Sequence, residues 1–169
     1  MISKILFIDD DYLYGAYPLP KKLDRDVLIS IIDMEQFSSI QDLLGEALYA
    51  DIETKVSAQS LNATEEGLFK LIQYSLAMYS ARAAATLLRS AIGRTKNEEQ
   101  GLNSFSLDGI INAVDSKISY INQKIIDYIL GDATLKAKAE EADKDKFNPS
   151  DNYNSSVFYP VDNISDDCD

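Results

Sequence analysis

The sequence predicts a mostly α-helical protein, a small bundle of about four helices with an extended N-terminal segment and a long C-terminal arm. Two long stretches, around residues 64–93 and 106–131, carry apolar side chains at helical spacing between capping residues. The stretch after residue 131 is rich in acids and loses this periodicity. We therefore expect a helical domain over residues 1–131 and an acidic extension, a docking arm, over residues 132–169.

Residues 1–23 are predicted to form an arm or loop, because an apolar segment is followed by a stretch whose prolines disfavour a helix. Asp24 is typical of a helix N-cap. Leu23 and Leu28 have the spacing of a hydrophobic staple. A first helix is therefore expected from Asp24 through about Phe37.

A second helix is predicted with Ser39 as its cap and Asp42 completing a weak capping box. Gly45 inside it either marks a close packing contact or divides the element into two short helices. The apolar face of this element comprises Ile40, Leu43, Leu44, Ala47, Leu48 and Ile52.

A long third helix is expected from a Thr64 cap to Gly93. Over residues 81–88 its apolar side chains spread around nearly the whole circumference, so this half must be buried on several sides. Either a neighbouring subunit covers it or the fold is unusually compact, and we favour the neighbour. The predicted subunit-interface residues are Ala81, Arg82, Ala84, Ala85, Leu88 and Arg89. The arginines are expected either to pair with carboxylates of that neighbour or to extend into solvent.

Residues 94–105 are polar and lack periodicity, which predicts an exposed loop. Its acids Glu98 and Glu99 either face a channel or lie in a solvated turn. Ser106 then caps a fourth helix whose apolar residues alternate spacings of three and four until Gly131. We expect this helix to pack against the third one.

The acidic extension begins with a Lys, Glu and Ala stretch that can be partly helical, but it is expected to take no part in the core. Within it lies an apolar island too isolated to build a core alone. The island, Val157, Phe158, Tyr159, Pro160 and Val161, is the predicted anchor for docking onto a partner ring.

Composition excludes several function classes. The formal net charge of -12 disfavours non-specific binding to nucleic acid. The absence of histidine removes the usual general base and histidine metal ligands, so an enzyme is not expected and no cofactor is indicated. The N-terminal sequence does not have the pattern of a secretory signal, and no apolar run is long enough for a membrane span. The only cysteine, Cys168, is compatible with a reducing cytosol.

Two N-terminal features have both a functional and a structural interpretation. Asp9, Asp10 and Asp11 could bind a hard cation, but without the spacing of a calcium loop we expect solvated or capping aspartates. The tyrosines of residues 12–17 could stack on bases. Because they follow acids and not basic residues, packing in an interface is the better interpretation.

The segments Ile40–Tyr49 and Thr64–Arg82, with the start Leu6–Leu13, resemble the head-to-tail adaptor proteins of tailed bacteriophages. The similarity is to members from phages of Bacteroidetes-type hosts, including the crAss-like group, and covers roughly residues 5–130. The extension after Gly131 is longer than in the simplest members.

This resemblance implies a virion protein that assembles in the host cytoplasm into a closed homo-oligomeric ring, commonly twelve-fold. Such a connector ring sits beneath the portal protein in the neck or collar, contacts neighbouring adaptor or tail proteins, and surrounds the channel through which DNA passes. The long extension leaves open whether the chain forms the first ring or a later one. The resemblance brings no catalytic residue with it.

Two other functions remain open on the sequence. An acidic regulatory or inhibitory protein could mimic nucleic-acid charge, but its acids should then form an ordered stripe, whereas here they are scattered and enriched in the extension. A hydrolase using two carboxylates is a third possibility, although nothing in the sequence pairs two acids.

Overall fold

The computed structural model describes residues 5–19, 23–94 and 104–140, and within these ranges the chain is mostly helical and has no strand. The prediction of a mostly α-helical protein is confirmed. In chain order the elements are α1 (Asp10–Ala16), α2 (Arg25–Glu35), the π-helical turn η1 (Gln36–Ile40), α3 (Gln41–Leu44), α4 (Glu46–Ser57), α5 (Ala63–Arg94), α6 (Ser104–Gly131) and α7 (Ala133–Glu140).

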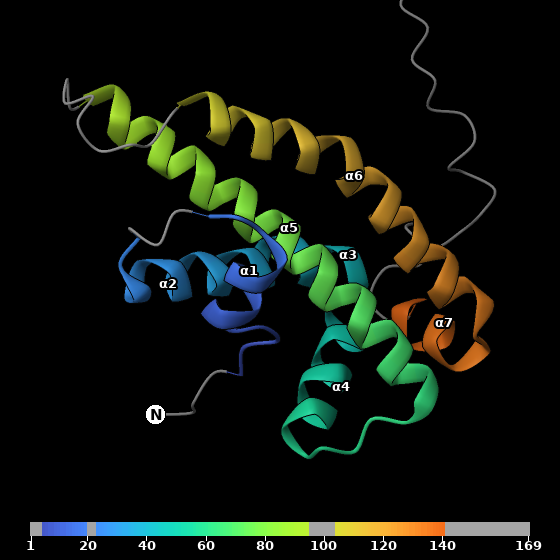
Figure 1. Cartoon of the computed structure of the whole chain (residues 1–169). Coiled ribbons are helices and arrows are strands. Elements are labelled where there is room, and N and C mark those ends of the chain that lie inside the picture. Colours follow the sequence, from blue (N-terminus) through green and yellow to red (C-terminus); the bar gives the residue numbers. More distant parts are fainter. Residues whose placement is uncertain (1–4, 20–22, 95–103, 141–169) are drawn as a thin grey trace, which may run out of the picture.

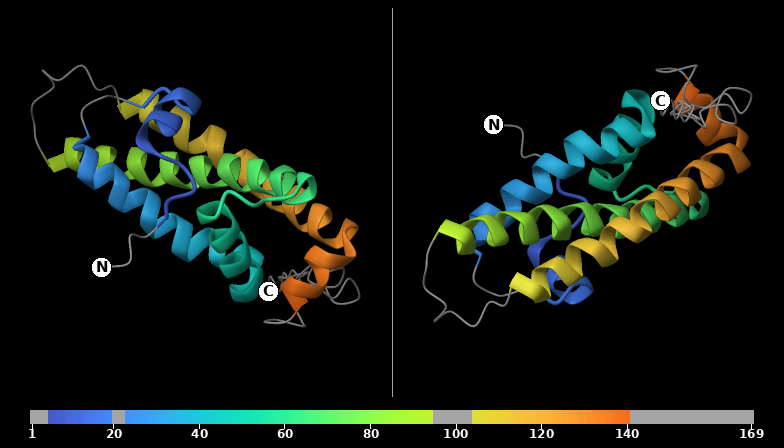
Figure 2. Two further views of the ribbon diagram at one scale, coloured as in Figure 1. Left: turned by 90° about the horizontal axis from the view of Figure 1, so that it is seen from below. Right: turned by 90° about the horizontal axis from the view of Figure 1, so that it is seen from above.

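Helices α5 and α6 form an antiparallel pair that runs the length of the molecule (Figure 1). At 32 residues, α5 is about 48 Å long. Helices α1 and α2 pack against the half of α5 that leads to its C-terminus, whereas α4 lies beside its other half and contacts α7 (Figures 1 and 2). The expected packing of the fourth predicted helix against the third is confirmed.

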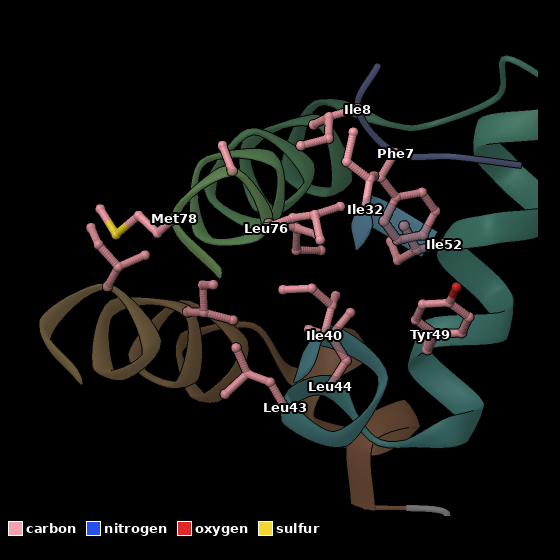
Figure 3. Packing of buried hydrophobic residues seen from close by; sticks show 14 of the residues in the cluster. Phe7, Ile8, Ile32, Ile40, Leu43, Leu44, Tyr49, Ile52, Leu76 and Met78 are labelled. Atoms are coloured by element: carbon pink, nitrogen blue, oxygen red, sulfur yellow. The ribbon is translucent and has the colours of Figure 1, made fainter. Parts of the chain in front are cut away.

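The core gathers apolar side chains from every helix around the middle of α5 (Figure 3). Leu28 and Ile32 come from α2, and Leu76 from α5. The pair of long helices is also joined by a polar contact, because Asn122 accepts a hydrogen bond from Ser75 at 3.1 Å and donates one to Tyr79 at 2.7 Å. Such a contact fixes the register of two otherwise apolar faces.

The N-terminal segment is partly helical, so the prediction of an arm or loop is wrong for α1. Asp9 caps this helix by accepting a hydrogen bond from the Tyr12 N–H at 2.7 Å. Pro18 stands just beyond the C-cap residue Tyr17, where a proline is tolerated. The prolines therefore limit the length of α1 without preventing it.

The extended residues before α1 are held in the core by the side chain of Gln36. Its amide oxygen accepts from the Phe7 N–H at 2.7 Å, and its amide nitrogen donates to the Ile5 carbonyl at 2.9 Å and the Tyr49 hydroxyl at 2.9 Å. Buried backbone groups need such partners. The Phe7 ring then packs at 5.4 Å against both Tyr49 and Phe69.

Helix α2 begins as predicted after Asp24, whose carboxylate accepts from the Asp26 N–H. The prediction that Ser39 starts a new helix is wrong. The helix continues through η1, and the Ser39 hydroxyl donates to Glu35 at 2.6 Å. Gly45 divides the predicted second helix into α3 and α4, because its φ of 78° is a conformation that glycine adopts readily.

Helix α5 begins two residues earlier than predicted, because its cap is Asn62 and not Thr64. The Asn62 side chain accepts from the Glu65 N–H at 2.9 Å, while the Glu65 carboxylate accepts from the Asn62 N–H at 3.0 Å. This reciprocal pair is a capping box, so Thr64 is not the cap. The helix continues to Arg94, one residue past the predicted end at Gly93.

Helix α6 starts two residues before the predicted Ser106 cap and ends at Gly131 as expected. The prediction that the extension takes no part in the core is wrong for α7, where Leu135 and Ala139 are buried in it. Lys138 also binds Asp51 of α4 at 2.5 Å. The helical core therefore extends to Glu140, beyond the boundary expected after Gly131.

Gly67 of α5 leaves room for the Tyr128 side chain of α6 near the α7 end of the molecule. A Cβ atom there would collide with the Tyr128 hydroxyl, which donates to the Thr64 carbonyl at 3.0 Å. We expect Gly67→Ala to lower the free energy of unfolding by about 1–3 kcal/mol, as overpacking does. Gly109→Ala is the control, because a Cβ there meets nothing within 4 Å and should stabilise the helix by up to about 1 kcal/mol. Urea unfolding measures both, and equal effects would contradict this packing.

Candidate functional site

Four of the predicted interface residues lie inside the protomer. Ala81, Ala84 and Ala85 have no exposed surface and Leu88 is buried, each within a hydrophobic cluster of the same chain. Small side chains at these positions allow neighbouring helices to pack closely. The expectation that a neighbouring subunit covers this face is therefore wrong for these four residues, because the chain covers them itself.

The two predicted interface arginines are exposed and pair within the chain. Arg82 binds Asp115 at 2.7 Å and Arg89 binds Asp108 at 3.2 Å, so both link α5 to α6. Their side chains remain about half exposed, and surface pairs of this kind contribute little to stability. Both guanidinium groups are thus still accessible to an incoming carboxylate.

The same half of α5 borders an apolar groove between α2, α5 and α6, which we call the α2–α5 groove. Its volume is about 630 Å³. Its apolar lining comprises Ile31 and Met34 of α2, Ala83 and Leu87 of α5, and Ile111 of α6. Polar side chains complete the lining: Glu35, Tyr79, Arg82, Thr86, Arg89 and Ser90.

Two large apolar side chains that line the groove, one from α2 and one from α5, are exposed to solvent. Met34 is 55 % exposed and Leu87 is 45 % exposed. Val27 lies one helical turn before Ile31 on the same side of α2. It extends the apolar surface into a second, shallower hollow. A contiguous exposed apolar surface rimmed by polar residues is typical of a protein-docking site.

The sequence of α2 contains a signal for this groove. In α2, Leu28 and Ile32 form the buried stripe, while Val27, Ile31 and Met34 follow one another at spacings of four and three on another side. A short helix with apolar residues on two sides needs a packing partner on each side. Within the described residues, the side with Leu28 and Ile32 is fully buried, whereas Val27 and Met34 on the other side are exposed.

A second exposed surface lies where α1 meets α5. It is formed by Tyr12, Tyr17 and Tyr74, and we call it the tyrosine patch. Burial, followed by the proximity of Tyr74 and Tyr12, raises the pKa of Tyr17 to about 12. Burial and Tyr74 also raise the pKa of Tyr12, which is still 39 % exposed. The earlier interpretation of these tyrosines as packing residues stays a prediction.

The aspartates beside the tyrosine patch have structural roles. Asp9 caps α1, and Asp10 pairs with Arg25 of α2 at 3.1 Å. Asp11 is exposed. In the part of the chain that the structure describes, no group of three or more acidic or cysteine side chains is placed to hold a metal ion. The structural interpretation of Asp9 as a capping residue is confirmed.

An ion network at the opposite end of the molecule joins α4, α5 and α7. Lys55 contacts both Asp51 and the buried Glu65, and Lys138 reaches Asp51. Burial opposes ionisation of Glu65, but hydrogen bonds from Lys55 and from the Asn62 N–H outweigh it and lower the pKa of Glu65. The hydrogen bond to Glu65 raises the pKa of Lys55 in turn. This network links the three helices and stabilises the fold.

Acid should therefore destabilise the protein through Glu65. Because its pKa in the folded chain lies below the ordinary value of 4.5, protonation favours unfolding as the pH falls below about 4.5. We expect Glu65→Gln to cost about 2 kcal/mol at neutral pH and to make the loss of stability in acid shallower. The exposed neighbour Glu66→Gln is the control and should change neither. Thermal unfolding at a series of pH values measures both effects. If the stability of Glu65→Gln falls in acid as steeply as that of the parent chain, the role assigned to Glu65 is contradicted.

The remaining predicted site residues, Glu98 and Glu99 and the island Val157, Phe158, Tyr159, Pro160 and Val161, lie outside the described residues. No model of a known protein family, no curated protein and no solved structure matches the chain. Among the described helices, none is both long and apolar enough to cross a membrane.

Proposed function

We propose that the protein is a structural subunit of the neck of a tailed bacteriophage. It assembles into a homo-oligomeric ring that joins the portal protein to the tail and surrounds the DNA channel. The resemblance of residues 40–49 and 64–82 to head-to-tail adaptors supports this function, as does the compact helical protomer. The function needs no catalytic group and no cofactor.

The observation that carries the proposal is the α2–α5 groove. Met34 and Leu87 are exposed in a chain whose charged surface otherwise keeps it soluble. Removing apolar surface from water contributes about 25 cal/mol per Å², so covering this groove favours association. A chain whose groove must be covered by a partner is expected to act as part of an assembly.

The acidic charge suits a channel for DNA. A net charge of -12 per chain repels phosphate, so a ring built from many copies lets the duplex slide without binding it. Glu98 and Glu99 are the candidate channel-facing residues in this proposal. We expect no phosphate-specific site in the ring.

The C-terminal residues supply the contact with a partner ring. The docking arm of the proposal begins after Glu140, because α7 belongs to the core. Residues 141–156 could span about 50 Å when extended, enough to carry the island at 157–161 beyond its own protomer. A deletion that removes the arm alone must therefore start at residue 141, since one starting after Gly131 also removes Leu135 from the core.

Native mass spectrometry of the purified full-length chain, over a range of concentrations, tests the proposal. A ring component gives a defined closed oligomer of many copies, seen as rings by electron microscopy, and shows no salt-sensitive binding of duplex DNA. A chain that stays monomeric or dimeric and binds basic proteins tightly and salt-dependently would instead be an acidic charge mimic, and the ring proposal would be wrong.

A further inference from the structure

We propose that the α2–α5 groove of one subunit receives the tyrosine patch of a second copy of this chain. This inference rests on the proposed ring function and names the two surfaces that meet between adjacent subunits. The occupant of the groove is thus the end of α1 with Tyr12, together with Tyr74 of α5.

The two surfaces lie on different sides of the protomer. Tyr74 and Leu87 are 13 positions apart on α5, which at about 100° per residue places them about 140° apart around the helix axis. Figure 2 shows the same separation, with α1 on one side of α5 and α2 on the other. A closed ring needs such an arrangement, because each subunit must use one surface toward the next copy and a different one toward the previous copy.

The apolar parts of the two surfaces are complementary in kind. The groove is concave and lined by Met34, Leu87 and Ile111, whereas the patch offers partly exposed aromatic rings. Tyrosine rings bury a large area with little loss of side-chain freedom, and a methionine thioether packs well against an aromatic edge. The phenol hydroxyls can remain at the wet rim.

The edges of the two surfaces carry charges of opposite sign that can meet. Arg82 and Arg89 line the groove beside Glu35; each pairs with one α6 carboxylate, Asp115 or Asp108, and remains at least half exposed. Asp9 and Asp11 flank Tyr12 and are exposed. A guanidinium group has five N–H donors, so each arginine can also donate to a carboxylate of the patch, whereas contact between two identical patches would bring carboxylates together. Tyr120 is exposed as well, but the Lys124 ammonium already lies 4.7 Å from its ring.

Disulfide trapping between single-cysteine variants tests the pairing in the full-length chain. Cys168→Ser removes the native thiol, and Tyr12→Cys and Leu87→Cys are then made separately. Each variant is checked for its oligomer mass and helical content before oxidation. The two are mixed as dissociated subunits, allowed to assemble and oxidised. A disulfide forms only where the two Cβ atoms come within about 4.5 Å.

The head-to-tail contact predicts a cross-linked dimer in the mixture and none in either variant alone, and the double variant should give a ladder of cross-linked species. A cross-link in Leu87→Cys alone means that two grooves face each other, which overturns the pairing. Leu87→Cys cross-linking to Phe158→Cys but not to Tyr12→Cys means that the arm fills the groove, which also overturns it. Normal oligomers without any cross-link refute this interface alone, whereas a failure of the parent chain to assemble refutes the ring proposal itself.

Discussion

Replacing Ala84 with arginine is expected to unfold the protomer itself. Ala84 has no exposed surface and lies in the main hydrophobic core of the same chain. An arginine there must either bury its charge without a partner or force the packed helices of the core apart. The expected loss is about 4 kcal/mol or more, a large part of the stability of a domain of this size.

Circular dichroism with thermal or urea unfolding measures this loss. Thr86→Arg is the matched control, because Thr86 is exposed only two positions away on the same helix and should tolerate the change. If Ala84→Arg unfolds at the same midpoint as Thr86→Arg, then the core of the chain does not cover this face of α5, and the expectation of a subunit interface at Ala84 regains its basis.

Placing acids in the α2–α5 groove is expected to abolish assembly while leaving the fold intact. Met34→Asp with Leu87→Asp puts two carboxylates in a groove that must lose its water when a partner covers it. Central apolar residues of an interface commonly contribute 2 kcal/mol or more each, so the association constant should fall by at least about 100-fold. Sedimentation velocity or native mass spectrometry over a range of concentrations measures this change in the association constant.

The fold should not change, since both side chains are already exposed in the protomer. Tyr120→Ser is the control, because it removes an equally exposed aromatic ring outside both surfaces and should leave assembly unchanged. Full assembly of the double aspartate variant would remove the groove from the interface.

The parts of the fold that sequence analysis predicted well are those with strong local signals. The regular apolar seam of α6 and its terminal Gly131 need no knowledge of the rest of the chain. The same holds for Asp24, whose capping chemistry acts within one helical turn. The sequence indicates that Gly45 either makes a close packing contact or divides the helix, and only its positive φ in the structure distinguishes the two.

The incorrect predictions concern features that depend on contacts between distant parts of the chain or on a choice between neighbouring capping residues. The apolar circumference around Ala84 shows that several partners are needed, yet spacing alone cannot tell a helix of the same chain from one of a neighbour. Helix α7 is anchored by only Leu135 and Ala139, too few to give a periodic signal before the packing is known. The Asn62 cap was missed because Thr64 two positions later offers the same capping chemistry.

The predicted interface residues lie on the same half of α5 as the proposed groove, but four of them are on a buried side of the helix. Sequence analysis chose these residues because apolar side chains spread around nearly the whole helix there, and the contacts of the alanines proved to be internal. The exposed side carries Leu87, and its other wall comes from Met34, more than fifty positions away in the sequence. No local pattern joins two such residues, so the groove becomes visible only when α2 is placed beside α5.

Electron cryomicroscopy of the neck of the purified phage particle tests the central claim most directly. The account predicts a closed ring of this chain between the portal protein and the tail, with the α2–α5 groove of each subunit covered by the α1 face of the next copy and with DNA passing through the middle. Absence of the chain from the particle, or its presence there with the groove open to solvent, would contradict the account.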